Sequence, residues 1–223
     1  MHKYHMHDLP AQAAPALLSR LATIPTAPIG HFYHWGFMAG GIQRLRPGEI
    51  VAGTAVTLSI PGADSTLLHH VLGLVRPGDF LVVERQGDRR HACWGGGVTR
   101  AARNAGLAGA VIDGPCTDPL EIEALAFPLW CRGVSAMTTR MLDVGGRFNL
   151  PVSCGGVAVC PGDVIVADES GLVVLPASEA AEIADTALAL AKVIAQGAQR
   201  LDSGELLGLV YGASALVGRG AGA

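Results

Sequence analysis

The stretch from Cys93 to Ser135 constrains the fold of this chain more than any other. A glycine turn opens a helical pattern, a short apolar run follows, and an acidic turn opens a second helical pattern. In the first pattern, small apolar residues recur at i, i+3, i+4 and i+7, which predicts a short helix packed against a sheet. These residues are Val98, Ala101, Ala102 and Ala105. The alternation of helix and strand predicts an α/β fold, with a strand-rich core flanked by helices.

Three glycines, Gly95, Gly96 and Gly97, form the mouth of the first predicted helix. Glycines allow a ligand to approach the backbone closely, and the first amides of a helix have no partner within it. The amides of Gly97 and Val98 would therefore favour a carboxylate or a phosphate. A plain tight turn is the alternative interpretation, because glycine-rich turns are common.

The apolar run from Leu107 to Gly114 predicts a strand buried on both faces, with Asp113 at its end. Asp118 lies in the turn beyond this strand and is followed by Pro119 and Glu121. This order fits a helix cap, with Asp118 as half of a capping box. It also fits a carboxylate that holds a divalent metal on the loop after a central strand.

At this point the chain resembles the RraA-like family, which includes 4-hydroxy-4-methyl-2-oxoglutarate aldolases, oxaloacetate decarboxylases and a regulator of ribonuclease activity. The resemblance spans roughly residues 15 to 212 and rests on motifs that occur in the same order. They are WGGG at 94–97, AGAVIDGPCTD at 108–118, FPLWCRG at 127–133 and LPVSCGGVAVCPGDVIVADESGLVVLP at 150–176.

The resemblance implies a single RraA-like domain over 1–223, of the swivelling β/β/α type, which assembles as homotrimers or as homohexamers made of two trimers. It also implies a site that binds Mg²⁺ or Mn²⁺ through a motif of one acid, twenty intervening residues and Arg-Asp. By position, the metal-binding aspartate is Asp118, the arginine is replaced by Thr117, and the first acid is replaced by Gly96. Of the later arginines, Arg132 and Arg140, we prefer Arg140 as a substitute, because it lies in a loop.

The leading functional hypothesis is therefore a lyase that cleaves or decarboxylates a small 2-oxo acid through a metal-stabilised enolate. The alternative is a catalytically silent binding or regulatory protein, which the two replaced motif residues favour. A third possibility is an enzyme for a less anionic substrate, with a pocket lined by His31, Tyr33, His34 and Trp35. A nicotinamide site is the weakest option, since Arg100 replaces the third glycine of the dinucleotide-binding pattern. The predicted catalytic residues are Thr117, Asp118 and Arg140, and the predicted substrate-binding residues are Gly95, Gly96, Gly97, Val98 and Thr117.

Composition narrows the remaining classes. The 223 residues are 50% hydrophobic and 16% charged, enough for a large core, and a net charge of −3 provides no field for nucleic acid or an anionic membrane. No apolar stretch is long enough to span a bilayer and the N-terminus is too polar for a signal peptide, so we expect a cytoplasmic protein. The five cysteines form no C-x-x-C pair, which argues against a disulfide framework or a zinc knuckle. A softer metal site from His91, Cys93, Cys116 and Asp118 is a minor alternative.

The rest of the chain is predicted from local patterns. We expect helices over 15–22, over 64–75 with Asp64 or Ser65 as the cap, and from Ser178 onward. The Pro-Gly-acid turns at 46–49, 76–79 and 160–163 each precede a β-branched run and predict entries to strands. The segments 1–12 and 218–223 are expected to be mobile.

Overall fold

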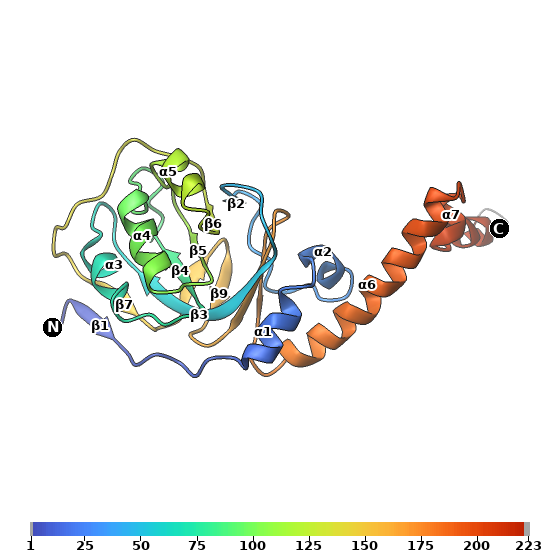
Figure 1. Cartoon of the computed structure of the whole chain (residues 1–223), viewed down its shortest axis with the longest axis horizontal. Helices are drawn as coiled ribbons and strands as arrows, with labels where there is room; N and C mark the ends of the chain where they lie inside the picture. The colour runs from blue at the N-terminus through green and yellow to red at the C-terminus, as the bar shows by residue number, and fades with distance from the viewer. Residues whose placement is uncertain (1, 221–223) are drawn as a thin grey trace.

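Four parallel strands form the centre of the computed structural model, which describes residues 2–220 (Figure 1). They lie side by side in chain order, and their carboxyl ends meet at one edge, because Val83 pairs with Ile112 and Val111 with Trp130. In open sheets of this kind, ligands bind at the carboxyl edge. The strands are β3 (Val51–Ser59), β4 (Asp79–Glu84), β5 (Gly109–Ile112) and β6 (Leu129–Cys131).

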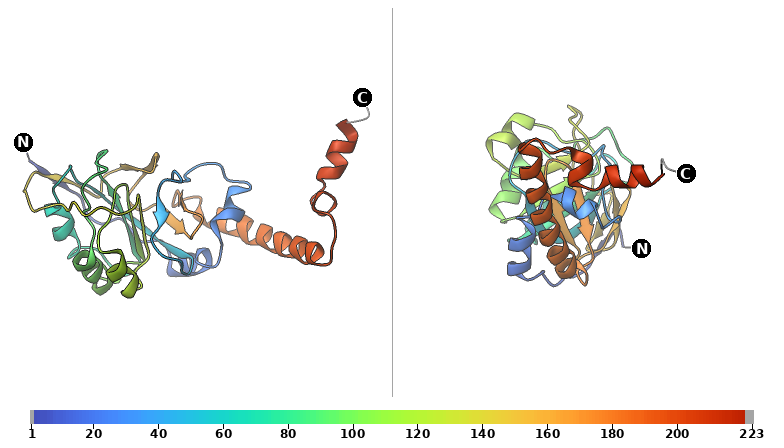
Figure 2. Two further views of the ribbon diagram at one scale, coloured as in Figure 1. Left: turned by 90° about the horizontal axis from the view of Figure 1, so that it is seen from above. Right: turned by 90° about the vertical axis from the view of Figure 1, so that its right-hand side faces the viewer.

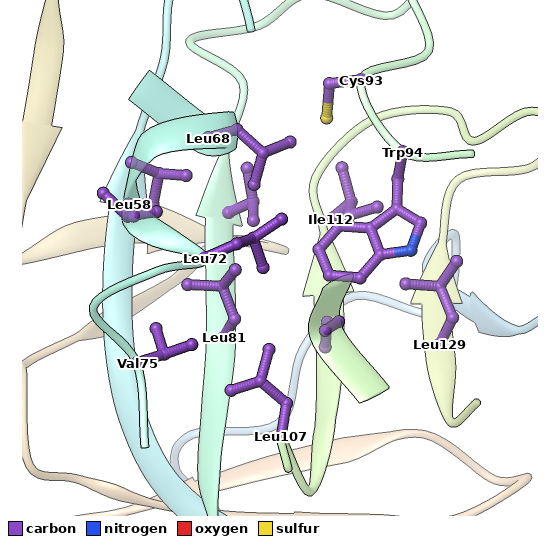
Figure 3. Packing of buried hydrophobic residues seen from close by; sticks show 14 of the residues in the cluster. Leu58, Leu68, Leu72, Val75, Leu81, Cys93, Trp94, Leu107, Ile112 and Leu129 are labelled. Carbon is purple, nitrogen blue, oxygen red and sulfur yellow. The ribbon is translucent and has the colours of Figure 1, made fainter. Parts of the chain in front are cut away.

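One helix connects each successive pair of these strands, and all three helices cover the same face of the sheet (Figure 1). Their apolar residues pack on the strands in the largest core cluster, where Leu68 and Leu72 face Leu81 and where Trp94 lies over Ile112 and Leu129 (Figure 3). The hydrophobic periodicity of the sequence therefore gives a one-sided helical layer. The helices are α3 (Thr66–Val71), α4 (Gly96–Asn104) and α5 (Pro119–Ala124).

Shorter strands extend the sheet and build a second β layer on its other face. β7 pairs antiparallel with β3, β2 pairs antiparallel with β6, and the β10–β11 hairpin continues the sheet from β3. The separate β8–β9 hairpin shares a second core cluster with β10 and β11. The α/β prediction with a strand-rich core is thus confirmed. The bounds are β2 (Gln43–Arg44), β7 (Gly146–Phe148), β8 (Val152–Cys154), β9 (Val157–Val159), β10 (Val164–Ala167) and β11 (Leu172–Leu175).

The three Pro-Gly-acid turns lead directly into β3, β4 and β10, as the sequence predicts. Two of them require glycine, because Gly78 has a φ of 86° and Gly162 a φ of 92°, values that other residues rarely adopt. A hairpin turn at 167–171 joins β10 to β11. Local turn chemistry therefore fixes where these strands begin.

The remaining helices lie at the other end of the molecule. α1 (Pro15–Leu21) and α2 (Thr26–Gly30) pack against the first turns of α6 (Ala180–Asp202) and the β10–β11 hairpin in a third core cluster. The rest of α6 projects away from the sheet and is followed by α7 (Leu207–Val210) and α8 (Ala213–Gly220) (Figures 1 and 2). We call residues 188–220 the C-terminal arm.

The N-terminal segment, which we expected to be mobile, makes defined contacts with the rest of the chain. Tyr4–Met6 form β1, which pairs in parallel with β7, and Gln12 donates a hydrogen bond of 2.8 Å to Asp79 Oδ1. The free edge of β7 provides backbone partners that the polar sequence does not reveal. At the other end, residues 218–220 belong to α8, and 221–223 lie outside the described residues. Between residues 2 and 220, none of the helices combines the length and apolar character that a bilayer crossing requires.

Candidate functional site

A surface cleft of about 280 Å³ lies at the carboxyl edge of the parallel strands. Four loops form it, and each follows a different strand: the start of α3 follows β3, the mouth of α4 follows β4, the Thr117–Asp118 turn follows β5, and the segment 138–141 follows β6. All residues that the sequence predicts as site residues line this one cleft. They are Gly95, Gly96, Gly97, Val98, Thr117, Asp118 and Arg140.

Trp94 fixes the mouth of α4. Its indole is fully buried, stacks on Phe127 with ring centroids 5.7 Å apart, and donates a hydrogen bond of 2.9 Å to Thr99 Oγ1. The Thr99 hydroxyl in turn donates to the carbonyl of Gly95 over 2.9 Å. Within the described residues, the amides of Gly97 and Val98 have no hydrogen-bond acceptor. Two free donors at the positive end of a nine-residue helix therefore face the cleft.

The Asp118 carboxylate points to α4 rather than to its own helix. It makes no capping hydrogen bond to α5, so the predicted capping box does not form; instead Oδ2 accepts a hydrogen bond of 3.1 Å from the amide of Gly96. The backbone explains the difference, because Asp118 has φ 52° and ψ 48°, whereas a capping residue usually has an extended backbone. Such left-handed residues concentrate at functional sites. The Asp118 side chain is exposed to the cleft.

Arg140 reaches the cleft because its loop is held by backbone hydrogen bonds. The Arg140 amide donates to the carbonyl of Ala63 over 2.8 Å, and its carbonyl accepts from the amide of Ser65 over 2.9 Å. The guanidinium is exposed and has no ion-pair partner in the described part of the chain. Arg132, the other candidate, is mostly buried and forms an ion pair with Asp113 outside the cleft. Arg140 is therefore the cation available to an anionic ligand.

The Asp64 carboxylate also holds the loop that carries Arg140. Its side chain is 2% exposed and accepts hydrogen bonds from the amides of Thr66, Leu142 and Val144 at 2.8, 3.0 and 2.8 Å. Burial raises the pKa of Asp64, but these hydrogen bonds outweigh burial and hold the pKa at about 2. Of the two predicted caps for α3, Asp64 and not Ser65 binds a backbone amide with its side chain.

The cysteine that lines the cleft, Cys93, has an unreactive thiol. Cys93 is buried, and burial raises the pKa of its thiol to about 11. It therefore remains protonated near neutral pH and provides neither a nucleophile nor a metal-binding thiolate. Of the other cysteines, Cys116, Cys131 and Cys154 are also buried, and Cys160 is exposed.

Two sequence predictions about other residues are wrong. The softer metal site does not assemble, because His91 Nδ1 lies 2.7 Å from Asp88 Oδ2 and Cys116 Sγ lies 3.5 Å from Cys131 Sγ. Residues 2–220 contain no group of three His, Cys, Asp or Glu side chains placed to hold a metal. The second is a place for the aromatic segment 31–35 in this cleft: the segment follows α2 beside α6, away from the cleft (Figure 1), where Tyr33 lines a separate cavity with Phe32 and Ile183, and Trp35 is 75% exposed.

Sequence reasoning missed a set of lining residues that come from α3, from the segment before α4 and from the loop after β6. Ser65 precedes the first residue of α3 and His69 lies within that helix. The loop after β6 passes beside Ala92, whose carbonyl accepts a hydrogen bond from the amide of Thr139 over 3.0 Å. These contacts join segments far apart in sequence, so no local sequence pattern predicts them. The missed residues are Ser65, His69, Ala92, Thr138, Thr139 and Met141.

Comparison with known proteins gives one consistent family. Residues 29–174 match the model described as RraA-like, Aldolase/RraA. A protein of Halalkalibacterium halodurans, provisionally named 4-hydroxy-4-methyl-2-oxoglutarate aldolase, is 33% identical over 74% of this chain and 79% of its own length. A Thermus thermophilus protein named 4-hydroxy-4-methyl-2-oxoglutarate aldolase is 33% identical over 51% of this chain and 68% of its own.

Solved structures agree with this result. The crystal structure of Streptomyces coelicolor RraAS2, described as an unusual member of the RNase ES inhibitor RraA protein family, is similar with a TM-score of 0.71 and 33% identity. The likeness covers 82% of this chain and 93% of that one. Both sequence and architecture therefore lead to the same group of proteins.

Proposed function

Because the chain belongs to the RraA-like family, we propose that it is a lyase that breaks a carbon–carbon bond next to the oxo group of a small 2-oxo acid. One observation carries this proposal: the Asp118 carboxylate, the free amides of α4 and the exposed guanidinium of Arg140 meet in one cleft. Such a cleft offers an anchor for a cation and donors for an anion side by side. A small oxo acid bound to a divalent cation has both features.

The chain supplies the groups that bind and orient this substrate. The amides of Gly97 and Val98 would donate hydrogen bonds to the substrate carboxylate, and the Arg140 guanidinium would neutralise its charge. Thr117, which is uncharged, has a hydroxyl that donates to Asp118 over 3.3 Å and is within the cleft wall. Thr117 would therefore orient Asp118 or, when its hydroxyl turns to the cleft, donate one neutral hydrogen bond to the substrate, and the positive charge that binds the substrate carboxylate would come from Arg140.

The donor set at Asp118 fits magnesium or manganese. Mg²⁺ is commonly bound through one or two carboxylates, with water and substrate oxygens as the other ligands, and a three-residue protein cage is not needed. Asp118 is exposed to the cleft and would hold the ion. When bound, the ion would supply Lewis-acid stabilisation of the negative charge that develops on the 2-oxo oxygen.

The proposal predicts metal-dependent release of pyruvate. We expect the wild-type protein to form pyruvate from oxaloacetate or 4-hydroxy-4-methyl-2-oxoglutarate when Mg²⁺ or Mn²⁺ is present. The bound ion would then supply the positive charge that stabilises the negative charge on the 2-oxo oxygen. Excess EDTA should remove the activity, and added metal should restore it. A coupled assay with lactate dehydrogenase and NADH measures the rate, and lactate dehydrogenase supplied with pyruvate under the same conditions is the control.

A non-catalytic binding or regulatory protein is the second candidate. The residues that favour it are Thr117 and Gly96, which stand where the family motif has an arginine and an acid. The relative from Streptomyces, described as a member of an RNase inhibitor family, is consistent with such a role. A folded protein without turnover on a panel of 2-oxo acids, with and without metals, would favour this candidate over the lyase.

The C-terminal arm supports the expected assembly into trimers or pairs of trimers. α7 and α8 expose large apolar side chains to solvent, including Leu209, Leu216 and Val217 at 60, 63 and 70%. Several large apolar side chains exposed close together are typical of a surface that docks on another copy. We therefore propose that the arm of one copy packs on the next.

Removal of α7 and α8, the last part of the arm, should break the assembly. A chain ending at Asp202 loses the exposed apolar helices but keeps the contacts of α6 with its own core. We expect it to sediment as a folded monomer whose far-UV spectrum loses only the helical signal of α7 and α8, whereas the full chain forms a trimer or hexamer. Sedimentation velocity measures both masses. The substitution Leu120→Ser, at an exposed apolar position on α5, is the control; an unchanged mass for the truncated chain would refute the role of the arm.

A further inference from the structure

Two consecutive glycines at the mouth of α4 each lie against a different carboxylate. A Cβ atom on Gly95 would lie 2.5 Å from Asp118 Oδ2, and a Cβ atom on Gly96 would lie 2.0 Å from Glu121 Oε2. A Cβ atom on Gly97 would meet nothing within 4 Å. The first two glycines therefore make room for two acidic side chains, whereas the third has open space around it.

Arg100 holds Glu121 in this position. Its Nη2 and Nε atoms both donate to Glu121 Oε1, at 2.7 and 3.2 Å. Oε2, the atom nearest to Gly96, has no hydrogen-bond donor among the described residues. The ion pair thus ties the second turn of α4 to α5 and leaves one carboxylate oxygen free beside the mouth.

We propose that Glu121 is the second acidic group of the site, presented from α5 into the space that a side chain at position 96 would occupy. This inference rests on the proposed function, and it concerns the residue that compensates for the glycine in the family motif. Arg100 balances the charge of Glu121, but the free Oε2 atom lies beside Gly96, whose amide donates to Asp118 Oδ2, and would accept a hydrogen bond from water bound to a divalent cation at Asp118. The glycine at position 96 is then needed to make room for the Glu121 carboxylate, in addition to replacing the acid of the family motif.

The arrangement has a specific consequence for substitutions at position 96. A methyl group there must displace the Glu121 carboxylate, and a flexible glutamate can swing away at little cost in stability. Gly96→Ala and Glu121→Ala should therefore damage the site in the same way. Because both changes remove one and the same carboxylate from the mouth, their effects should not add.

The affinity of the full-length chain for Mn²⁺, measured by electron paramagnetic resonance, tests the proposal without an activity assay. We expect Glu121→Ala and Gly96→Ala each to weaken binding by about 10- to 100-fold, the range seen when groups that support a metal site are lost. The double variant should be no weaker than either single one. Glu123→Ala, an exposed glutamate on the same helix, should bind like wild type. Gly96→Asp should restore affinity in the Glu121→Ala background, where its side chain has room.

The outcomes separate this inference from the proposed function. Binding that requires Asp118 but is unchanged by Glu121→Ala would overturn the role of Glu121 and leave the lyase proposal intact. A loss with Gly96→Ala that adds fully to that of Glu121→Ala would also overturn it, because the glycine would then act through its backbone alone. Absence of saturable Mn²⁺ binding in the wild-type chain would overturn both.

Discussion

Asp118→Asn is expected to reduce metal-dependent turnover of a 2-oxo acid by about 100-fold or more. The carboxylate is the acidic group that faces both the cleft and the mouth of α4, and its loss removes the anchor for the cation. An electrostatic contact that stabilises developing charge is worth about 3–4 kcal/mol, and each 1.4 kcal/mol corresponds to a factor of ten in rate. The variant should therefore lose nearly all activity while remaining folded.

Asparagine is the informative replacement because it changes charge and little else. Asp118 has a left-handed backbone with φ 52°, which asparagine tolerates better than alanine does. The amide oxygen of asparagine still accepts the hydrogen bond from Gly96, so the turn should keep its shape. A loss of activity in Asp118→Asn thus reports on the negative charge and not on the backbone.

The measurement is the steady-state rate at saturating substrate and metal, together with the melting temperature. Glu123→Gln removes a charge of the same sign from the same helix and should keep the wild-type rate. Retention of more than about a third of the activity in Asp118→Asn would mean that Asp118 only shapes the turn. The lyase proposal would then lack its central residue.

The parts of the molecule that could be predicted from sequence are those set by local chemistry. The small-residue face of α4, the buried run of β5 and the Pro-Gly turns before β3, β4 and β10 each depend on neighbours in the chain. The convergence of Asp118 with the glycine mouth could also be predicted, since both follow parallel strands whose carboxyl ends share an edge. Short-range patterns thus indicated the fold class and the position of the cleft, while the roles of its residues stay predictions.

Other features depend on contacts between distant segments, which a single sequence does not reveal. The strand β1 is defined by pairing with β7, about 140 residues later, and its three residues are too few to show a period of their own. Backbone hydrogen bonds to Ala63 and Ala92 hold the Arg140 loop in place, and such bonds leave no signature in the sequence. The capping box failed for a similar reason: the mouth of α4 competes for Asp118, and Arg100 draws Glu121 toward Gly96.

Asp64 links stability to pH and to the cleft. Its pKa is about 2 in the folded protein, below the value of about 3.9 for an unfolded chain. A lowered pKa stabilises the fold wherever the carboxylate is ionised, so this contribution is fully present above about pH 4 and is lost as the pH falls toward 2. Its size is about 3 kcal/mol. The carboxylate holds the amides of Leu142 and Val144 and therefore the loop that carries Arg140.

Asp64→Asn is accordingly expected to destabilise the protein by about 2–4 kcal/mol at pH 7, because an amide NH₂ replaces an oxygen that accepts from buried amides. The difference from wild type should shrink between pH 4 and pH 2, where wild-type Asp64 becomes protonated. Urea unfolding across this pH range measures it. Asp143→Asn, at an exposed carboxylate of the same loop, should change stability by less than about 1 kcal/mol. A difference in stability that does not change with pH would show that Asp64 acts through packing alone. A difference that shrinks as the pH falls, together with a weaker affinity of Asp64→Asn for the oxo acid, would show that the buried carboxylate positions Arg140.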